Sequence, residues 1–268
     1  MKDNNFKDFL MGKKLYGDDF NDKEIKEWFK DEKEGYSGLI FPRYHKYGDH
    51  AINIYHGYRK LKKIKKFSNV LGFGSALGDD LLPIINKADK ITIVEPSSEL
   101  ISKDIGGKKV KYISPKPNGK LDFNDNTFDL IVCFGVLHHI PNVSAIIKEL
   151  TRVLTKEGHL LIREPIVSMG DWRKPRKGLT KRERGIPINI FRKIIKENKL
   201  NILSEEKILF PLLIRLNLWE HSGGNSMILV WLDAVLSKLF SWNNKYHAKN
   251  FFQKLRPQSV FYILQKRK

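Results

Sequence analysis

Residues 121–165 read LDFNDNTFDLIVCFGVLHHIPNVSAIIKELTRVLTKEGHLLIREP, and this stretch decides the fold. It contains two runs that are apolar almost throughout, FDLIVCF (128–134) and HLLIREP (159–165). Between them a helical pattern begins near Pro141 and buries one face, made of Ile146, Ile147, Leu150 and Val153. Strands without polar alternation are typical of a parallel sheet that is covered on both faces. The stretch therefore predicts a strand–helix–strand unit of an α/β fold.

The same alternation continues on both sides of this stretch. Five further segments have the composition of strands: 70–73, 91–96, 110–114, 201–210 and 258–266. Helices are expected after Gly78 and at 187–198. We therefore expect an α/β, Rossmann-like architecture, with a mostly parallel sheet and helices on both of its faces.

Two parts of the chain are expected from these patterns. Residues 1–67 form an N-terminal helical segment, with helices at 22–34 and 50–66, and residues 68–268 form the core. Tyr44 and its neighbours, ahead of the second of these helices, could form a lid. We treat 1–67 as a helical or lid segment that adds to the core.

The core carries two unusual segments in its second half. Residues 166–186 are basic and lack periodicity, which predicts a long loop. Residues 211–257 are an insertion before the last strand, rich in aromatic side chains and with an amphipathic run at 226–242. We expect both segments on the acceptor side of the core, with the insertion packing on it as a hydrophobic cap. An insertion of this length is uncommon unless it is functional.

Composition narrows the class of protein. The 268 residues carry a formal net charge of +19 and one cysteine, Cys133, which excludes a disulfide framework and a Cys-rich zinc module. We expect a cytoplasmic protein, because there is no apolar leader and charged residues interrupt the apolar runs. The charge is uneven: residues 1–158 hold 27 basic and 22 acidic residues, and residues 159–268 hold 22 and 8. Most of the excess of basic over acidic residues therefore lies in residues 159–268, which indicates a local reason for it.

A glycine-rich turn follows the first predicted strand. It reads Gly72-Phe73-Gly74-Ser75-Ala76-Leu77-Gly78, and the second strand ends in Glu95. In open parallel sheets the backbone N–H groups of this turn face a polar ligand, and an acid after the second strand accepts hydrogen bonds from ribose hydroxyls. Turn, acid and strand order together predict an adenosine-containing cofactor.

Residues 50–166 resemble the class I S-adenosylmethionine-dependent methyltransferases, in particular the small-molecule type with a VLHHI-like signature. The resemblance implies a seven-stranded sheet with an antiparallel last strand and S-adenosyl-L-methionine as the cofactor. It implies that eleven residues bind this cofactor: Gly72, Gly74, Ser75, Ala76, Gly78, Glu95, Pro96, Asn118, Phe134, Gly135 and Val136. Three positions depart from the family pattern, which has an acid at Gly72, a glycine at Ala76 and an acid near Pro117. A dinucleotide-dependent dehydrogenase is an alternative interpretation, since it also has a glycine-rich turn and an acid. It gives no reason for the sequence pattern at 128–141.

Three residues are candidates for a general base. His138 and His139 follow the fourth strand, and Glu164 ends the fifth. Histidine suits proton removal near neutral pH, and an alcohol needs this help more than a neutral amine does. We favour His139. His138 could face solvent, and Glu164 could instead pair with Arg163. No metal site is expected.

An arginine cluster follows the fifth strand. Together with Tyr44, five arginines are predicted to bind the acceptor: Arg163, Arg173, Arg176, Arg182 and Arg184. The planar guanidinium recognises phosphate and carboxylate groups. The cluster predicts a small anionic acceptor, such as a nucleotide-activated, phosphorylated or lipid-linked saccharide of surface-glycan biosynthesis, methylated on oxygen or nitrogen.

Two other functions stay open, and so does the question of what the aromatic insertion binds. The net charge also suits an RNA methyltransferase, although no RNA-binding module is recognisable. A methyltransferase-like protein that binds ligands without catalysis is the second alternative. The aromatic insertion suggests peripheral contact with the inner membrane surface or a dimer interface, and the sequence does not determine the oligomeric state.

Overall fold

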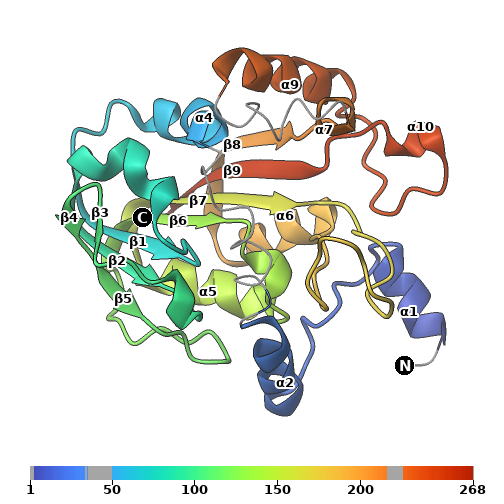
Figure 1. Cartoon of the computed structure of the whole chain (residues 1–268), viewed down its shortest axis with the longest axis horizontal. Helices are drawn as coiled ribbons and strands as arrows, with labels where there is room; N and C mark the ends of the chain where they lie inside the picture. Colours follow the sequence, from blue (N-terminus) through green and yellow to red (C-terminus); the bar gives the residue numbers. More distant parts are fainter. Residues whose placement is uncertain (1–2, 34, 36–49, 216–225, 268) are drawn as a thin grey trace.

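A seven-stranded sheet forms the centre of the molecule (Figure 1), in a computed structural model that describes residues 3–33, 35, 50–215 and 226–267. The strand order is β5-β2-β1-β6-β7-β9-β8. The strands are β1 Phe67–Phe73, β2 Ala88–Val94, β5 Lys111–Ile113, β6 Phe128–Phe134, β7 Leu154–Pro165, β8 Leu200–Ile208 and β9 Ser259–Lys266. The first five strands of this set run parallel, and β9 runs antiparallel to both of its neighbours. The predicted Rossmann-like sheet, with its antiparallel last strand, is confirmed.

Helices cover both faces of the sheet because β6 is apolar on both of its sides. Ile131 and Cys133 face a core shared with α5 (Val143–Val153) and α6 (Ile188–Glu197). Leu130 and Val132 face the opposite core, which includes side chains of η4 (Asp79–Lys87), η3 (Tyr58–Leu61) and α9 (Met227–Leu239). The continuous apolar run at 128–134 thus reflects burial on both faces.

Two predicted helices differ from the observed structure. The segment expected as a helix at 50–66 is a short α-helix, α4 (His50–Ile52), then a π-helical turn, η2 (Asn53–Gly57), and the 3₁₀-helix η3. The helix expected after Gly78 is the 3₁₀-helix η4, which contains Pro83. Proline has no N–H for an α-helical hydrogen bond, so it disfavours a regular α-helix there.

The N-terminal part divides differently from the predicted boundary at residue 67. Ala51, Ile52, Tyr58 and Leu61 belong to the buried core beside the sheet, so 50–61 is part of the core rather than of a lid. The extension proper holds α1 (Asp3–Leu10) and α2 (Asp22–Glu32). α2 begins with a reciprocal capping box between Asn21 and Glu24. α1 lies beside the 166–186 loop (Figure 1), where Phe6 contacts Trp172.

The second half confirms the long loop and shows how the insertion folds. Residues 166–186, all of them described, contain no helix or strand. The described residues of the insertion form α7 (Pro211–Arg215), α9 and α10 (Phe251–Lys254). Three small elements complete the chain: η5 (Ser98–Leu100), the β3–β4 pair (Asp104–Ile105 and Lys108–Lys109) and η6 (Leu137–His139).

Candidate functional site

A cleft opens at the carboxyl ends of β1, β2 and β6, where open parallel sheets bind ligands. Together with the open solvent at its mouth, it encloses roughly 820 Å³ of space. Residues from α2 form one wall: Trp28, Phe29, Glu32 and Lys33. The rest comes from the ends of β1 and β2, from loop 115–119 and from segment 135–141. The N-terminal extension therefore helps to form the cleft.

The glycine turn after β1 is fastened to the end of β2. The backbone N–H of Gly74 donates to the Val94 carbonyl (2.8 Å), and that of Ala76 donates to Glu95 Oε2 (3.1 Å). The Ser97 N–H donates to Glu95 Oε1 (3.1 Å). Gly74 has φ +68°, and a Cβ there would lie 2.6 Å from the methyl carbons of Val136. Because a carboxylate oxygen accepts two hydrogen bonds, Glu95 is held rigidly and can still accept others.

The structure brings five of the predicted cofactor residues to the cleft: Gly74, Glu95, Pro96, Gly135 and Val136. Gly72, Ser75, Ala76 and Gly78 support the turn without lining the cleft. Asn118 is exposed, although its neighbours Pro117 and Gly119 line the cleft and its carbonyl accepts the Asn142 amide (3.0 Å). These five residues therefore shape the glycine turn and loop 115–119, and their side chains do not line the cleft.

Phe134, which was predicted to bind the cofactor, does not line the cleft. We expected it to bind the cofactor, but its side chain lies in the core that Leu130 and Val132 face, with its ring centroid 5.2 Å from that of Phe261 and 6.3 Å from that of Tyr58. The alternation of β6 explains this position, since Val132 and Phe134 share a face.

A buried carboxyl lies beneath the turn. The Ser75 hydroxyl donates to Asp80 Oδ2 (3.0 Å), and Asp80 Oδ1 has no hydrogen-bond partner. Gly72 leaves room for this arrangement, because a Cβ on residue 72 would lie 2.6 Å from Ser75 Oγ. Burial raises the pKa of Asp80 to about 7, although the Ser75 hydrogen bond opposes the shift.

This pKa predicts a pH-dependent stability. Between the ordinary pKa of 3.8 and the folded value of about 7, the folded chain holds a proton that the unfolded chain has lost. Stability should therefore fall as the pH rises through this interval and remain lower above it. We expect Asp80→Asn to abolish this fall and to exceed wild type at about pH 8, by on the order of 3 kcal/mol. Denaturant unfolding at about pH 5 and about pH 8 measures it.

The matched control for this prediction is Asp89→Asn. Asp89 is an exposed acid at the start of β2 that pairs with Lys66. Its variant should follow the wild-type pH dependence. A wild-type protein that is equally stable at both pH values contradicts the role given to Asp80.

Glu164 does not stand at the mouth of the cleft, so the prediction that it is an accessible base is wrong. It is 1% exposed. Its Oε1 accepts the N–H groups of Val136 and Leu137 (2.8 Å each), and its Oε2 lies 2.8 Å from His138 Nδ1. The backbone after β6 supplies these donors at a strand end, where no ladder partner satisfies them. Glu164 shapes segment 136–138 instead of contacting a substrate.

His138 is held by that carboxylate. Burial and then the neighbouring His139 lower the pKa of His138, while Glu164 opposes the shift. Its side chain is 12% exposed, and it does not line the cleft. The prediction that His138 faces solvent is wrong, and we assign it a positioning role beside His139.

His139 lines the cleft and is bound to α2. Its Nδ1 lies 2.9 Å from Glu32 Oε2 and 3.3 Å from Thr180 Oγ1, and the Trp28 indole N–H donates to its carbonyl (2.6 Å). Burial alone would raise the pKa of Glu32, but hydrogen bonds from His139 and Thr180 lower it, so Glu32 is ionised. An acceptor at Nδ1 places the ring proton there and leaves Nε2 as the basic nitrogen.

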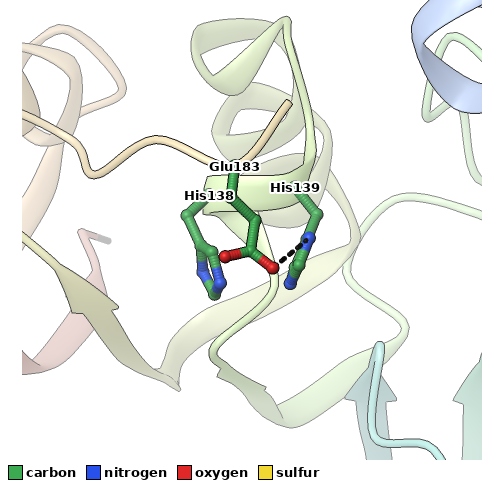
Figure 2. Close-up of side chains that lie close together, drawn as sticks. All are labelled: His138, His139 and Glu183. Carbon is green, nitrogen blue, oxygen red and sulfur yellow. Dashed lines mark ion pairs between the residues drawn. The ribbon is translucent and has the colours of Figure 1, made fainter. Parts of the chain in front are cut away.

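Sequence reasoning missed Glu32, Thr180 and Glu183. Figure 2 shows the Glu183 carboxylate next to the rings of His138 and His139, with Oε1 3.6 Å from His139 Nδ1. Glu183 Oε1 also accepts the Thr180 N–H (3.1 Å) and lies 3.0 Å from the Thr180 hydroxyl oxygen. One signal was available for Glu32: it follows Trp28 by four positions on the buried face of α2, where a carboxylate needs a partner.

His138, His139 and Glu183 could also hold a metal ion, since one ligand atom from each lies within 4.8 Å of the others. The Nδ1 atoms of both histidines and Glu183 Oε1 already have protein partners. We therefore interpret the three side chains as part of a hydrogen-bonded group that fixes the two imidazole rings.

The arginine cluster does not form the predicted acceptor site. Arg184 is 1% exposed, and its guanidinium donates to five backbone carbonyls, those of Tyr16, Leu137, His138, Ile140 and Pro141. Arg176 donates to four carbonyls of its own loop. Arg176 satisfies carbonyls of a loop that has no helix or strand, and Arg184 satisfies carbonyls of Tyr16 and of segment 137–141. The prediction that these two residues bind the acceptor is wrong.

Three other predicted acceptor residues, Arg163, Arg173 and Arg182, also lie outside the lining of the cleft. Arg173 pairs with Asp171 (3.0 Å) and Arg182 with Asp31 (2.6 Å). Arg163 lies on the opposite face of β7 from Glu164, with its guanidinium 5.7 Å from the Phe134 ring. Tyr44 lies outside the described residues. Within the described lining, the basic side chains other than His139 are Lys33 and Lys116.

The sequence was compared with protein families and with curated proteins. Residues 50–193 match the model of a family described as "Methyltransferase domain". A phosphatidylethanolamine N-methyltransferase of Cereibacter sphaeroides is 26% identical over 98 residues, which cover 34% of this chain and 47% of that protein. The chain thus spans about half the length of this curated relative.

Solved structures share the fold. An S-adenosylmethionine-dependent methyltransferase from Mesorhizobium loti matches with a TM-score of 0.52 and 13% identity, over 78% of this chain and 97% of that one. The N-methyltransferase NodS from Bradyrhizobium japonicum WM9, solved with S-adenosyl-L-homocysteine, matches with a TM-score of 0.51 and 11% identity, over 89% and 100%. At these identities the likeness concerns the fold.

Proposed function

Since this chain belongs to a family of methyltransferase domains, we propose that it transfers the methyl group of S-adenosyl-L-methionine to an oxygen or nitrogen of a small anionic acceptor. One observation carries the proposal. The cleft beside Glu95, at the end of β2, also contains His139, whose Nδ1 contacts Glu32 (2.9 Å). A polar anchor for a nucleoside and a basic nitrogen thus share one cleft.

The residues present fit S-adenosyl-L-methionine. Glu95 suits two ribose hydroxyls, because it lines the cleft and backbone donors orient both of its carboxylate oxygens. Val94, Pro96 and Pro117 provide apolar surface for a base. Gly135 lines the cleft with φ +71°, and the one atom near a Cβ built there is His138 Cε1 at 3.8 Å. The backbone at residue 135 is therefore open to a ligand.

When bound, the cofactor supplies an electrophilic methyl group. The chain has to hold the acceptor in line with that group, and orientation accounts for much of the catalysis. His139 is the group suited to take the proton of an acceptor hydroxyl. Glu32 is a positioning residue that fixes the His139 ring. Trp28 and Phe29 cover the cleft and exclude water from it.

For the acceptor we propose a saccharide that is phosphorylated, nucleotide-activated or lipid-linked, as in surface-glycan biosynthesis. Since the arginine cluster binds the protein's own backbone and acids, the anionic group would meet Lys33 and Lys116 at the cleft. Lys116 pairs with the exposed Asp122 (2.6 Å) and would exchange this partner for the anion. The Cereibacter sphaeroides relative is named for a lipid acceptor, which supports the lipid-linked form of the saccharide. Because that lipid carries an amine, the test below also includes an amine acceptor.

The experiment is methyl transfer from cofactor labelled on the methyl group. The purified chain is incubated separately with nucleotide sugars, sugar phosphates, lipid-linked saccharides, phosphatidylethanolamine vesicles and total RNA. We expect label in an anionic saccharide, and a KM for it that rises about tenfold in Lys33→Gln through loss of one charged contact. Label in RNA alone contradicts the acceptor proposal and favours an RNA methyltransferase.

Glu95→Gln tests how the cofactor is held. Loss of the charge should weaken S-adenosyl-L-methionine binding by about tenfold, since a hydrogen bond to a carboxylate contributes more than one to an amide. The cofactor-dependent rise of Tm measures the change. Glu99→Gln, an exposed neighbour in η5, should bind like wild type. Equal cofactor-induced shifts in all three proteins would exclude Glu95 from the site.

A further inference from the structure

α9 packs on the sheet with its polar side inward. Asp233 and Ser237, one helical turn apart, are 1% and 0% exposed. The Asp233 carboxylate accepts the N–H groups of Leu209 (2.9 Å) and Phe210 (2.6 Å), where the chain leaves β8. Leu209 and Phe210 follow the end of β8, so their N–H groups have no partner in the sheet and need another acceptor. This need explains why the acid Asp233 is buried. The hydrogen bonds of Asp233 and the burial of Val230 in the core therefore fix the inward face of α9.

The outward face of the same helix is apolar. Ile228, Trp231, Val235 and Leu239 recur at helical spacing and are 76%, 54%, 37% and 64% exposed. A helix of a globular protein usually places such a stripe toward the core. The expectation of a cap whose apolar side packs on the core is thus wrong for this stripe, which needs another apolar environment.

Large aromatic side chains extend this surface beyond α9. Trp242, Phe251 and Phe252 are 75%, 59% and 78% exposed. Figure 1 shows α7, α9 and α10 along one side of the molecule, next to β8 and β9. Exposed apolar side chains gathered on neighbouring elements mark an interaction site, whereas single exposed residues do not. We call the α9 stripe with Trp242, Phe251 and Phe252 the apolar surface.

The exposed charged side chains of segment 226–258 all carry the same sign. Residues 226–258 contain four exposed lysines, Lys238, Lys245, Lys249 and Lys254. Asp233, buried under α9, is the one acid in this range. A second copy of the chain would bring like charges together, which opposes association. An anionic lipid headgroup layer is complementary to them.

We propose that the apolar surface binds the interface of an anionic lipid bilayer, with α9 lying in the plane of the membrane. Tryptophan and phenylalanine side chains insert at the headgroup level of such interfaces, and lysines pair with anionic lipids. In the part of the chain that the structure describes, no helix has the length and apolarity to cross a bilayer. The binding is independent of the methyl-transfer reaction.

The test is flotation of the full chain with lipid vesicles in a density gradient. Vesicles of phosphatidylcholine alone are compared with vesicles that contain one third phosphatidylglycerol. We expect flotation with the anionic vesicles, weakened by salt. Trp231→Ser/Phe252→Ser should lower the partition coefficient by about tenfold or more, because two inserted side chains are lost. Lys249→Gln/Lys254→Gln should lower it by about tenfold at low ionic strength.

Ile101→Ser is the matched control, since Ile101 is 49% exposed and lies after η5, away from the apolar surface. It should float like wild type. Failure of the wild-type chain to float with anionic vesicles overturns the proposal, as does undiminished flotation of Trp231→Ser/Phe252→Ser. A dimer in sedimentation velocity that these two substitutions dissociate, without vesicle binding, also overturns it and assigns the surface to a second copy.

Discussion

Replacing His139 with Gln is expected to lower kcat by about 10²–10⁴-fold, the usual contribution of a positioned general base. Gln keeps polarity and approximate size but has no basic ring nitrogen. Affinity for S-adenosyl-L-methionine should stay within about threefold of wild type, because Glu95 and the glycine turn are untouched. Turnover of the acceptor identified by methyl labelling measures the first effect, and calorimetry measures the second.

Glu32→Gln is the companion to this variant, because Glu32 acts through His139. We expect an intermediate loss of kcat, about 10–100-fold, and a changed pH–rate profile, since the carboxylate no longer fixes the ring and its proton. A purely structural role for Glu32 would lower Tm and leave the profile unchanged. If His139→Gln retains kcat within about fivefold of wild type, proton removal by His139 is wrong and the acceptor reacts unaided, as a neutral amine can.

Arg184→Met is expected to lower the free energy of unfolding by about 3 kcal/mol or more, because five buried or half-buried carbonyls lose a charged donor. Met fills a similar volume, so lost hydrogen bonds cause most of the change. For a chain of this size the Tm should fall by about 10 °C. Chemical denaturation and calorimetry check both values.

Lys177→Met is the control for Arg184. It removes an exposed charge from the same loop and should change stability by less than about 0.5 kcal/mol. An Arg184 variant as stable as Lys177→Met, but with a raised KM for the acceptor, would restore Arg184 as a substrate residue.

The sequence predicts the sheet well because its signal is local. FDLIVCF at 128–134 matches β6 at both ends, and the last strand matches β9 to within one residue. Continuous apolar runs can only be buried between two layers, so pattern alone identifies them. The helices expected at 50–66 and after Gly78 are present, but the first ends at Leu61 and both are largely π- or 3₁₀-helical, because Pro83 and the close packing of Gly57 on Phe261 impose these geometries.

Side-chain roles depend on contacts between distant segments, and there the sequence predicts less. Glu32 and His139 are 107 positions apart, and no periodicity connects them. Arg184 looked like an anion ligand because spacing does not reveal which carbonyls lack donors. The orientation of α9 likewise depends on N–H groups of Leu209 and Phe210 that require Asp233.

The central claim is that the cleft between Glu95 and His139 binds S-adenosyl-L-methionine. Titration calorimetry of the cofactor into the wild-type chain tests it most directly. We predict saturable binding at one site per chain, competed by S-adenosyl-L-homocysteine and weakened in Glu95→Gln. Absence of saturable heat, with a Tm unchanged by the cofactor, would contradict the claim and leave a methyltransferase fold that has lost its cofactor.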